Sequence, residues 1–246
     1  MEKTRDYFDK NVESFSESRN QIWPELNELK KYIKDGERIL DLGCGNGRLF
    51  PALGGSAAGG EIKYIGIDAS RKLIEKAREK YGDHFKVADI LSLPCTQETN
   101  KTAKSSKEEF GWQGLPFSDN YFDSIWAIAV FHHIPSKALR AQMLEGVKRI
   151  LKPGGKVIIT CWNLYQSQYF KLLLKFTFRK FFGLSKLDFK DVLLSPKKIK
   201  IQRYYHAFTK RELKKLFQKT GFRVEGLKYL KRNNKKTNIL VVAVKQ

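Results

Sequence analysis

Arg38-Ile-Leu-Asp-Leu-Gly-Cys-Gly-Asn-Gly47 is the stretch of this 246-residue sequence that decides its fold. Its apolar residues predict a buried strand over 39–42. The glycines at 43, 45 and 47 then allow a sharp turn whose backbone can lie against a ligand without Cβ obstruction. Asp41 stands just before that turn, at the end of the predicted strand.

Two more aspartates stand in equivalent places along the chain. Asp68 follows the apolar run 62–67, and Asp89 follows the short run 85–88. A carboxylate at the end of a strand can accept hydrogen bonds from both hydroxyls of a ribose. Three successive strands that each end in an acid therefore predict a nucleoside site at the carboxyl edge of a parallel sheet.

Helical periodicity alternates with the strands, as in βα units. Apolar residues repeat at helical spacing over 22–33, and Ser70, Ser136 and the capping box Thr209-Lys-Arg-Glu212 each predict the start of a helix. Strands are predicted near 38–42, 62–67, 85–88, 123–130 and 156–162. Two last runs, 222–229 and 238–244, flank a polar turn and predict a closing hairpin.

The net charge of +21 is concentrated in the last third of the chain. Residues 1–160 carry 25 Lys and Arg against 22 Asp and Glu, whereas residues 161–246 carry 22 against 4. Such a basic region attracts polyanions, of which nucleic acid is the commonest. A solvated lysine-rich surface without a polyanionic partner is the alternative.

The cysteines and the apolar runs indicate the compartment. Cys44, Cys95 and Cys161 share no metal-ligand spacing and are odd in number, so we expect reduced thiols and no metal site. The first residues lack the apolar stretch of a signal peptide, and the run 125–131 is too short to cross a bilayer. We therefore expect a soluble, cytoplasmic protein without membrane association.

Two segments fall outside the βα plan. Residues 96–109 have no apolar periodicity and are expected to form a mobile surface loop. Residues 164–184 combine aromatic residues with Lys and Arg at helical spacing, within a basic insertion near 164–205. The segment predicts a basic amphipathic helix that packs on the core with snorkelling lysines, or alternatively a membrane-surface or RNA-stacking helix.

Five of these motifs together resemble the class I S-adenosylmethionine-dependent methyltransferases. They are the Asp41–Gly47 turn, Asp68, Asp89, the strand 122–130 and the segment 151–157. The glycine spacing G-x-G-x-G differs from the G-x-G-x-x-G of dinucleotide folds. The resemblance implies one domain over 1–246, with a Rossmann-like α/β fold: a seven-stranded, mostly parallel sheet, helices on both faces and a C-terminal antiparallel hairpin. S-adenosyl-L-methionine is then the donor and S-adenosyl-L-homocysteine the product.

The same resemblance implies which residues hold the donor. Asp41 is expected near the ammonium group of the methionyl part, and Asp68 on the ribose hydroxyls. The other expected donor contacts are Arg19, Gly43, Cys44, Gly45, Asn46, Ala69, Asp89, Ile90, Ala127 and Val130.

A narrower set of motifs resembles the tRNA wobble-uridine carboxymethyl methyltransferases, which include the methyltransferase domain of the AlkB-homologue tRNA enzymes. These motifs are 15–19, Trp23-Pro24, 128–134, Cys161-Trp162 and 203–206. Family members esterify a 5-carboxymethyl group on the first anticodon uridine, and eukaryotic relatives work with a small zinc-containing activator subunit. The resemblance thus implies tRNA as a partner and such a subunit as another. Residues 96–109 and 164–190 depart from the family pattern.

The acceptor side follows from the chemistry of the transfer. A sulfonium methyl is already electrophilic, so catalysis is mostly positioning, and a carboxylate acceptor with a pKa of about 4 needs no general base. The enzyme has to hold and partly desolvate that anion. The residues expected to do so are His132, His133, Arg203 and Tyr205, with Tyr204 and Arg19 as further candidates.

Other interpretations of these residues stay open. The histidines could cap the helix that begins near Ser136, Arg203 could bind RNA phosphate, and the tyrosines could be core residues. A small-molecule methyltransferase would use the histidine pair as a general base on a hydroxyl or amine. A non-enzymatic RNA- or membrane-binding module on the same fold is the third hypothesis.

Overall fold

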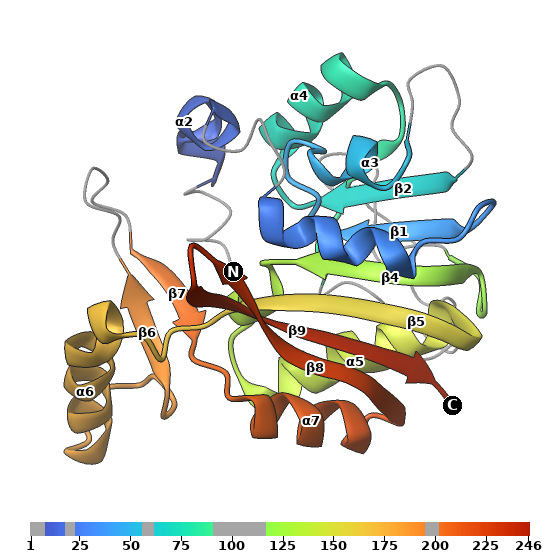
Figure 1. Ribbon diagram of the computed structural model, residues 1–246. Coiled ribbons are helices and arrows are strands. Elements are labelled where there is room, and N and C mark those ends of the chain that lie inside the picture. The colour runs from blue at the N-terminus through green and yellow to red at the C-terminus, as the bar shows by residue number, and fades with distance from the viewer. Residues whose placement is uncertain (1–7, 18–22, 56–61, 91–116, 195–201) are drawn as a thin grey trace, which may run out of the picture.

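The computed structural model of the chain describes residues 8–17, 23–55, 62–90, 117–194 and 202–246. Seven of the described strands form one sheet in the order β3-β2-β1-β4-β5-β9-β8 (Figure 1). β9 runs opposite to the other six strands, which all run in the same direction. This arrangement confirms the predicted α/β sheet and its closing hairpin. The strands are β1 (Arg38–Leu42), β2 (Lys63–Asp68), β3 (Phe85–Val87), β4 (Phe122–Ile128), β5 (Leu151–Trp162), β8 (Phe222–Arg232) and β9 (Lys235–Lys245).

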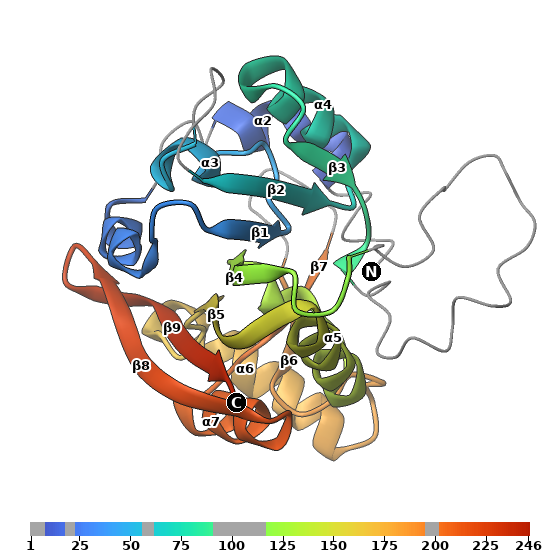
Figure 2. The same cartoon turned by 90° about the vertical axis from the view of Figure 1, so that its right-hand side faces the viewer.

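Helices cover both faces of this sheet, as Figure 2 shows. One apolar core lies between the sheet and α5 and α7, and a second lies between the sheet and η1, α3 and α4. The alternation of Ile39 and Leu40 along β1 sends one side chain into each core. The helices are α2 (Val12–Glu17), η1 (Pro24–Tyr32), α3 (Leu49–Ala52), α4 (Arg71–Tyr81), η4 (Phe131–His133), α5 (Lys137–Ile150), α6 (Ser167–Phe181) and α7 (Lys210–Lys219).

Local sequence signals set the ends of these elements. The hydroxyls of Ser70, Ser136 and Thr209 each accept a hydrogen bond from the amide three residues further on, at 3.2 to 3.3 Å, so all three predicted caps are confirmed. Asn233 and Asn234 take positive φ angles of 49° and 59° at the turn between β8 and β9. Two consecutive residues with positive φ are typical of a type I′ turn, whose twist matches that of the two strands in a hairpin.

Two elements differ from the prediction. The apolar repeat over 22–33 forms a 3-10 helix over its described part, because Leu26 and Leu29 are buried three residues apart and so suit three residues per turn. β5 begins at Leu151, directly after α5, instead of near 156. Its irregular first residues pair with β4 through a register shift next to Phe122.

A small subdomain lies beyond the carboxyl ends of the central strands (Figure 1). It consists of α6 and a two-stranded antiparallel sheet of β6 (Asp191–Leu194) and β7 (Arg203–His206). Sequence analysis did not predict this second sheet, because neither strand has a long alternating pattern. The loop expected at 96–109 lies outside the described residues.

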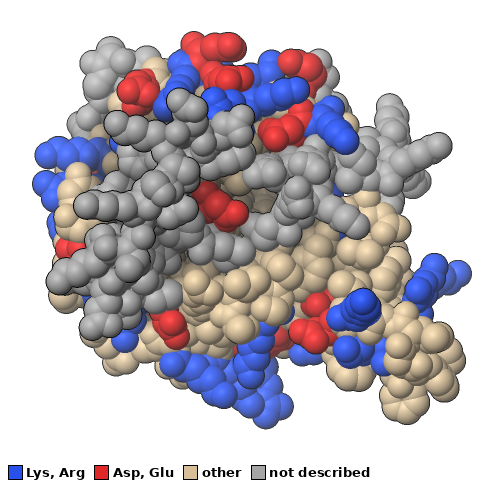
Figure 3. All heavy atoms as spheres, turned by 180° about the vertical axis from the view of Figure 1, so that it is seen from behind, with Lys and Arg blue, Asp and Glu red and all other residues tan. Residues whose placement is uncertain are grey.

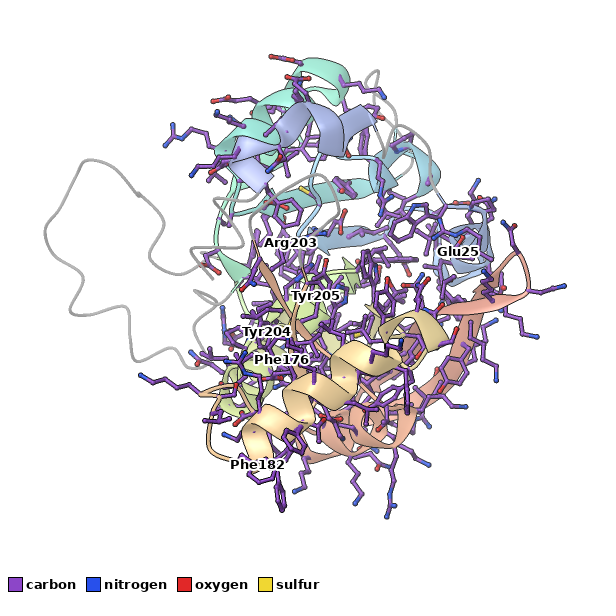
Figure 4. The ribbon with its side chains drawn as sticks, turned by 90° about the vertical axis from the view of Figure 1, so that its left-hand side faces the viewer. Glu25, Phe176, Phe182, Arg203, Tyr204 and Tyr205 are labelled. Atoms are coloured by element: carbon purple, nitrogen blue, oxygen red, sulfur yellow. The ribbon has the colours of Figure 1, made fainter. Side chains whose placement is uncertain are left out.

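Helix α6 corrects the expectation of a core-packed helix. Only one side packs inward, through Tyr169, Leu172, Leu173 and Phe176, and no residue of the helix is fully buried. Its other side carries large apolar side chains in water, such as Phe178 with 63% of its surface exposed. Figure 3 shows this end of the molecule mostly uncharged with Lys and Arg at its margin, and Figure 4 shows Phe182 at the end of α6.

None of the described helices is both long enough and apolar enough to cross a membrane.

A buried polar network ties the subdomain to α7. His206 contacts Asp191 through Nδ1 and Glu212 through Nε2, both at 2.6 Å. The imidazole ring therefore joins two carboxylates from different elements. Burial raises the pKa of Glu212, but hydrogen bonds from His206 and Lys190 outweigh it and lower that pKa to about 2.

We therefore expect His206→Leu to lower the free energy of unfolding by about 3 kcal/mol, because it leaves two carboxylates at a buried site without their shared donor. Arg223→Leu is the control, since it removes an exposed ion pair with Glu225 and should cost less than about 1 kcal/mol. Urea denaturation of both variants checks the difference. Equal losses in the two variants would contradict the structural role of His206.

Candidate active site

Most of the predicted site residues line one cavity of about 400 Å³, which lies at the carboxyl ends of β1, β2 and β4. This volume is within the range of sites for small molecules and cofactors. Twelve of the predicted site residues line it: Asp41, Gly43, Cys44, Gly45, Asn46, Asp68, Ala69, Asp89, Ile90, Val130, His133 and Arg203.

The glycine turn forms one wall of the cavity. The amides of Gly43 and Cys44 both donate to the carbonyl of Ile67, at 2.7 and 3.0 Å, which holds the turn against the end of β2. Gly43 has a φ of +71°, and a Cβ added there would lie 2.4 Å from a methyl carbon of Val130. The turn therefore requires glycine for its backbone conformation and for its close approach to the strand opposite.

Asp68 is held by backbone amides at the next strand end. Its Oδ2 accepts from the amide of Gly45 at 3.0 Å and its Oδ1 from the amide of Ser70 at 2.8 Å. Burial raises the pKa of Asp68 to about 6, although these two hydrogen bonds act in the opposite direction. Each carboxylate oxygen retains a second lone pair, so Asp68 can still accept from ligand hydroxyls.

Asp41 is almost fully buried, and its Oδ2 accepts a hydrogen bond from the Tyr64 hydroxyl at 2.7 Å. Burial raises the pKa of Asp41 to about 7, even though the Tyr64 hydrogen bond and the charge of Arg48 lower it. A buried carboxylate with a raised pKa is stabilised in its ionised form by a cation. The ammonium group of an amino-acid ligand fits this requirement.

The remaining predicted residues lie elsewhere. Ala127, His132 and Tyr205 are fully buried behind the cavity and do not line it. Arg19 lies outside the described residues. The structure therefore brings most of the predicted site together, but it places three members in the surrounding packing.

Another wall of the cavity is basic and aromatic. Arg203 lines it, with its guanidinium carbon 5.8 Å from the ring centre of Phe8 and 5.4 Å from that of Tyr205. His133 lines it too, and its Nδ1 donates to the carbonyl of Tyr204 at 2.9 Å. These groups can bind an anion next to the glycine turn.

His132 supports this side from behind. Its ring is parallel to that of Tyr205, with centres 5.2 Å apart, and its Nδ1 accepts from the amide of Trp162 at 3.2 Å. Burial, together with the nearby His133 and Arg203, lowers the pKa of His132 well below its ordinary value. His132 is therefore a neutral packing group, and neither histidine caps α5.

Tyr204 points away from the cavity. Neighbouring side chains alternate along β7, so Arg203 and Tyr205 share one side while Tyr204 and His206 share the other. The Tyr204 hydroxyl donates to Asp191 at 2.7 Å, within the network that holds the subdomain.

Sequence analysis missed several lining residues, including Phe8, Arg48, Ala129 and Trp162. Trp162 ends β5 at the same sheet edge as the three aspartates, and this position is the signal that could have identified it. Phe8 and Arg48 are brought in by tertiary packing, which no local pattern indicates.

Comparison with known proteins agrees with this geometry. A protein-family model described as "Methyltransferase domain" matches residues 15–227. The chain is 34% identical over 163 residues to the tRNA (carboxymethyluridine(34)-5-O)-methyltransferase of Arabidopsis thaliana, which covers 66% of this chain and 33% of that protein. It is 27% identical over 223 residues to a putative methyltransferase of Encephalitozoon cuniculi, covering 89% of this chain and 86% of that protein. The chain thus spans about a third of the length of the Arabidopsis relative.

Solved structures show the same fold. A SAM-dependent methyltransferase of Methanosarcina mazei has a TM-score of 0.65 at 21% identity, covering 92% of this chain and 98% of that one. A Haloferax volcanii structure, described as a complex between the Trm112 methyltransferase activator and the putative methyltransferase, has a TM-score of 0.58 at 18% identity, covering 98% and 96%. Because the family model spans most of the chain, this protein belongs to the methyltransferase family, and its fold is that of the S-adenosylmethionine-dependent enzymes.

Proposed function

We propose that this methyltransferase esterifies a carboxylate on tRNA, the 5-carboxymethyl group of the wobble uridine. The observation that carries the proposal is the buried Arg203 side chain in the wall of the donor cavity, which His133 also lines. The Arabidopsis relative is named for this reaction, which supports the same acceptor here. The excess of Lys and Arg in residues 161–246 supports an RNA partner.

The donor fits the cavity in a specific orientation. When bound, S-adenosylmethionine supplies a methyl group on a positively charged sulfur. We assign its ammonium group to Asp41, its ribose hydroxyls to Asp68 and its methionyl part to Gly43, Gly45 and Asn46. Asp89 and Ile90 flank the adenine, with Ala69 nearby and with Val130 and the buried Ala127 beneath the pocket.

The acceptor needs binding and desolvation. A carboxylate is ionised at neutral pH, so no side chain has to remove a proton from it. Arg203 holds the anion beside the donor, and the rings of Phe8 and Trp162 exclude water. His133 adds a hydrogen bond to the anion only when its ring is doubly protonated, because its Nδ1 proton already binds the Tyr204 carbonyl. His132 and Tyr205 keep Arg203 and His133 in place through ring contacts.

The same proposal includes a protein partner and a compartment. The Haloferax volcanii neighbour is described in complex with an activator, and the shared fold supports a small activator subunit for this chain. Action on tRNA would place the enzyme in the cytoplasm.

Asp68→Ala is expected to weaken donor binding at least 100-fold. Two ribose hydroxyls would lose charge-assisted hydrogen bonds worth about 1.5 to 3 kcal/mol each. Calorimetric titration with S-adenosylmethionine checks this value. Asp83→Ala, at an exposed aspartate after α4, is the matched control, and unchanged affinity in Asp68→Ala would remove the ribose assignment.

Donor affinity should depend on pH through Asp41 and Asp68. Their pKa values in the free protein are about 7 and about 6, and both must be ionised to hold the donor. Affinity therefore falls as the pH drops through 7 and then 6, by up to about tenfold per pH unit for each group. Calorimetry from pH 5.5 to 8.5 measures this fall, and a flat profile would contradict both assignments.

The acceptor is tested by incubation with labelled donor and bulk tRNA that lacks its wobble methyl ester. We expect label in the wobble nucleoside by mass analysis, and alkali should release it because an ester hydrolyses. RNA affinity should fall linearly with salt on a log–log plot, with a slope of about −0.7 to −0.9 per phosphate contact. Label found only in small molecules would refute an RNA acceptor.

A further inference from the structure

A second hollow lies next to the donor cavity and has no role in the site described so far. Its volume is about 120 Å³, and it lies between the start of α6, the start of β9 and the residue before η1. Trp162 lines both this hollow and the donor cavity. The hollow and the donor cavity therefore share a wall residue.

The walls suit a flat heterocycle. Trp23, Tyr169 and Trp162 contribute aromatic rings, and the rest of the lining is mostly amide side chains. Aromatic rings stack on nucleobases, and amide groups hydrogen-bond to the edges of bases. This combination is typical of sites that hold an unstacked base.

Two of the four amide side chains, those of Asn163 and Gln166, are already hydrogen-bonded within the protein. Asn163 donates to the carbonyl of Lys236 at 2.8 Å and accepts from the amide of Tyr165 at 3.1 Å. Gln166 donates to the carbonyl of Asn163 at 2.6 Å. These groups shape the hollow, but their short contacts already satisfy the groups that form them.

Asn238 is the exception. It is 2% exposed, and its Nδ2 donates to Glu25 and Thr237 at 3.4 Å each. Its Oδ1 has no hydrogen-bond partner among the described residues, and neither has Oε2 of the buried Glu25, which Figure 4 shows beside the hairpin of β8 and β9. A buried acceptor without a donor is costly, so a ligand in the hollow that offers an N–H or O–H group to Asn238 would be favoured.

Two arginines link the hollow to the donor cavity. The guanidinium carbons of Arg48 and Arg232 lie 4.1 and 5.3 Å from the ring centre of Trp23. Arg48 lines the donor cavity, whereas Arg232 lines the hollow. Arg232 also pairs with Glu25 at 3.6 Å, and the further N–H groups of a guanidinium can bind a phosphate that joins the two halves of a ligand.

We propose that this hollow binds the nucleobase next to the nucleotide that receives the methyl group. The base packs against Tyr169 and Trp162 and donates an N–H to Oδ1 of Asn238, while Arg48 and Arg232, which lie over the Trp23 ring, face the connecting phosphate. The inference rests on the proposed RNA acceptor and assigns a second contact to it.

Binding of labelled anticodon stem–loops, measured by fluorescence anisotropy with S-adenosylhomocysteine present, tests the proposal. The RNAs carry an intact base, an abasic site or 3-methyluridine, which lacks the pyrimidine N–H, on either side of the wobble uridine. We expect abasic substitution on one side only to weaken binding roughly tenfold or more. With uridine as the intact base, 3-methyluridine on that side should weaken binding as well.

Tyr169→Ala should weaken binding of the intact RNA to a similar extent and add little to the abasic loss, because both remove the same contact. Tyr165→Ala is the matched control, an exposed tyrosine four residues earlier that does not line the hollow. Unchanged donor affinity in both variants shows that they are folded.

Three outcomes would overturn the inference. The first is RNA that binds equally well with an abasic site on either side of the wobble uridine. The second is a loss of RNA affinity in Tyr169→Ala that multiplies in full with the loss from the abasic site. The third is a loss of RNA affinity in Tyr165→Ala as large as that in Tyr169→Ala. Methylation of the same RNAs tests the proposed function separately. Flank-dependent binding without methylation would refute the proposed reaction and leave the base site standing.

Discussion

The carboxylate of Asp68 holds the donor half of this molecule together. Its two oxygens accept the amides of Gly45 and Ser70, and so join the glycine turn after β1 to the start of α4. Without that anion, two backbone amides at the mouth of the cavity would lose their acceptor. The group that organises the apoprotein is thus also the one that we propose for the ribose, and its raised pKa reflects how much of its hydration it has given up.

The two halves of the site are built by different means. The donor half comes from the ends of parallel strands and from the backbone of a glycine turn, so its shape depends little on any one flexible side chain. The acceptor half comes from side chains of β7, η4 and the end of β5, held by ring contacts and by the His206 network. A fixed donor half beside a side-chain-built acceptor half is consistent with a fold that serves many acceptors.

The sequence predicted the donor half well because its signals are local. Glycine spacing, strand-terminal aspartates and Ser or Thr caps act within a few residues, and the structure places them as expected. It predicted the acceptor half less well, because that half depends on which side chains of β7 face the cavity. Tyr204 and Tyr205 are adjacent in sequence, yet one bonds Asp191 and the other stacks on His132.

The exposed side of α6 was beyond prediction for a related reason. Helical spacing of apolar residues indicates an amphipathic helix, but it does not say how wide a stripe the neighbours cover. Here β6 and β7 present a narrow surface, and Phe178 and its neighbours stay in water.

The reversed direction of β9 has a consequence for how this fold can diversify. Because β9 runs against β5, its beginning reaches the edge where β5 ends, and Asn238 pairs directly with Trp162. The turn before β9 and the segment after β5 therefore meet at this edge, while the strands whose ends carry the three aspartates lie elsewhere in the sheet. A duplicated gene could alter both segments and acquire a new substrate while it inherits the methyl-donor machinery unchanged.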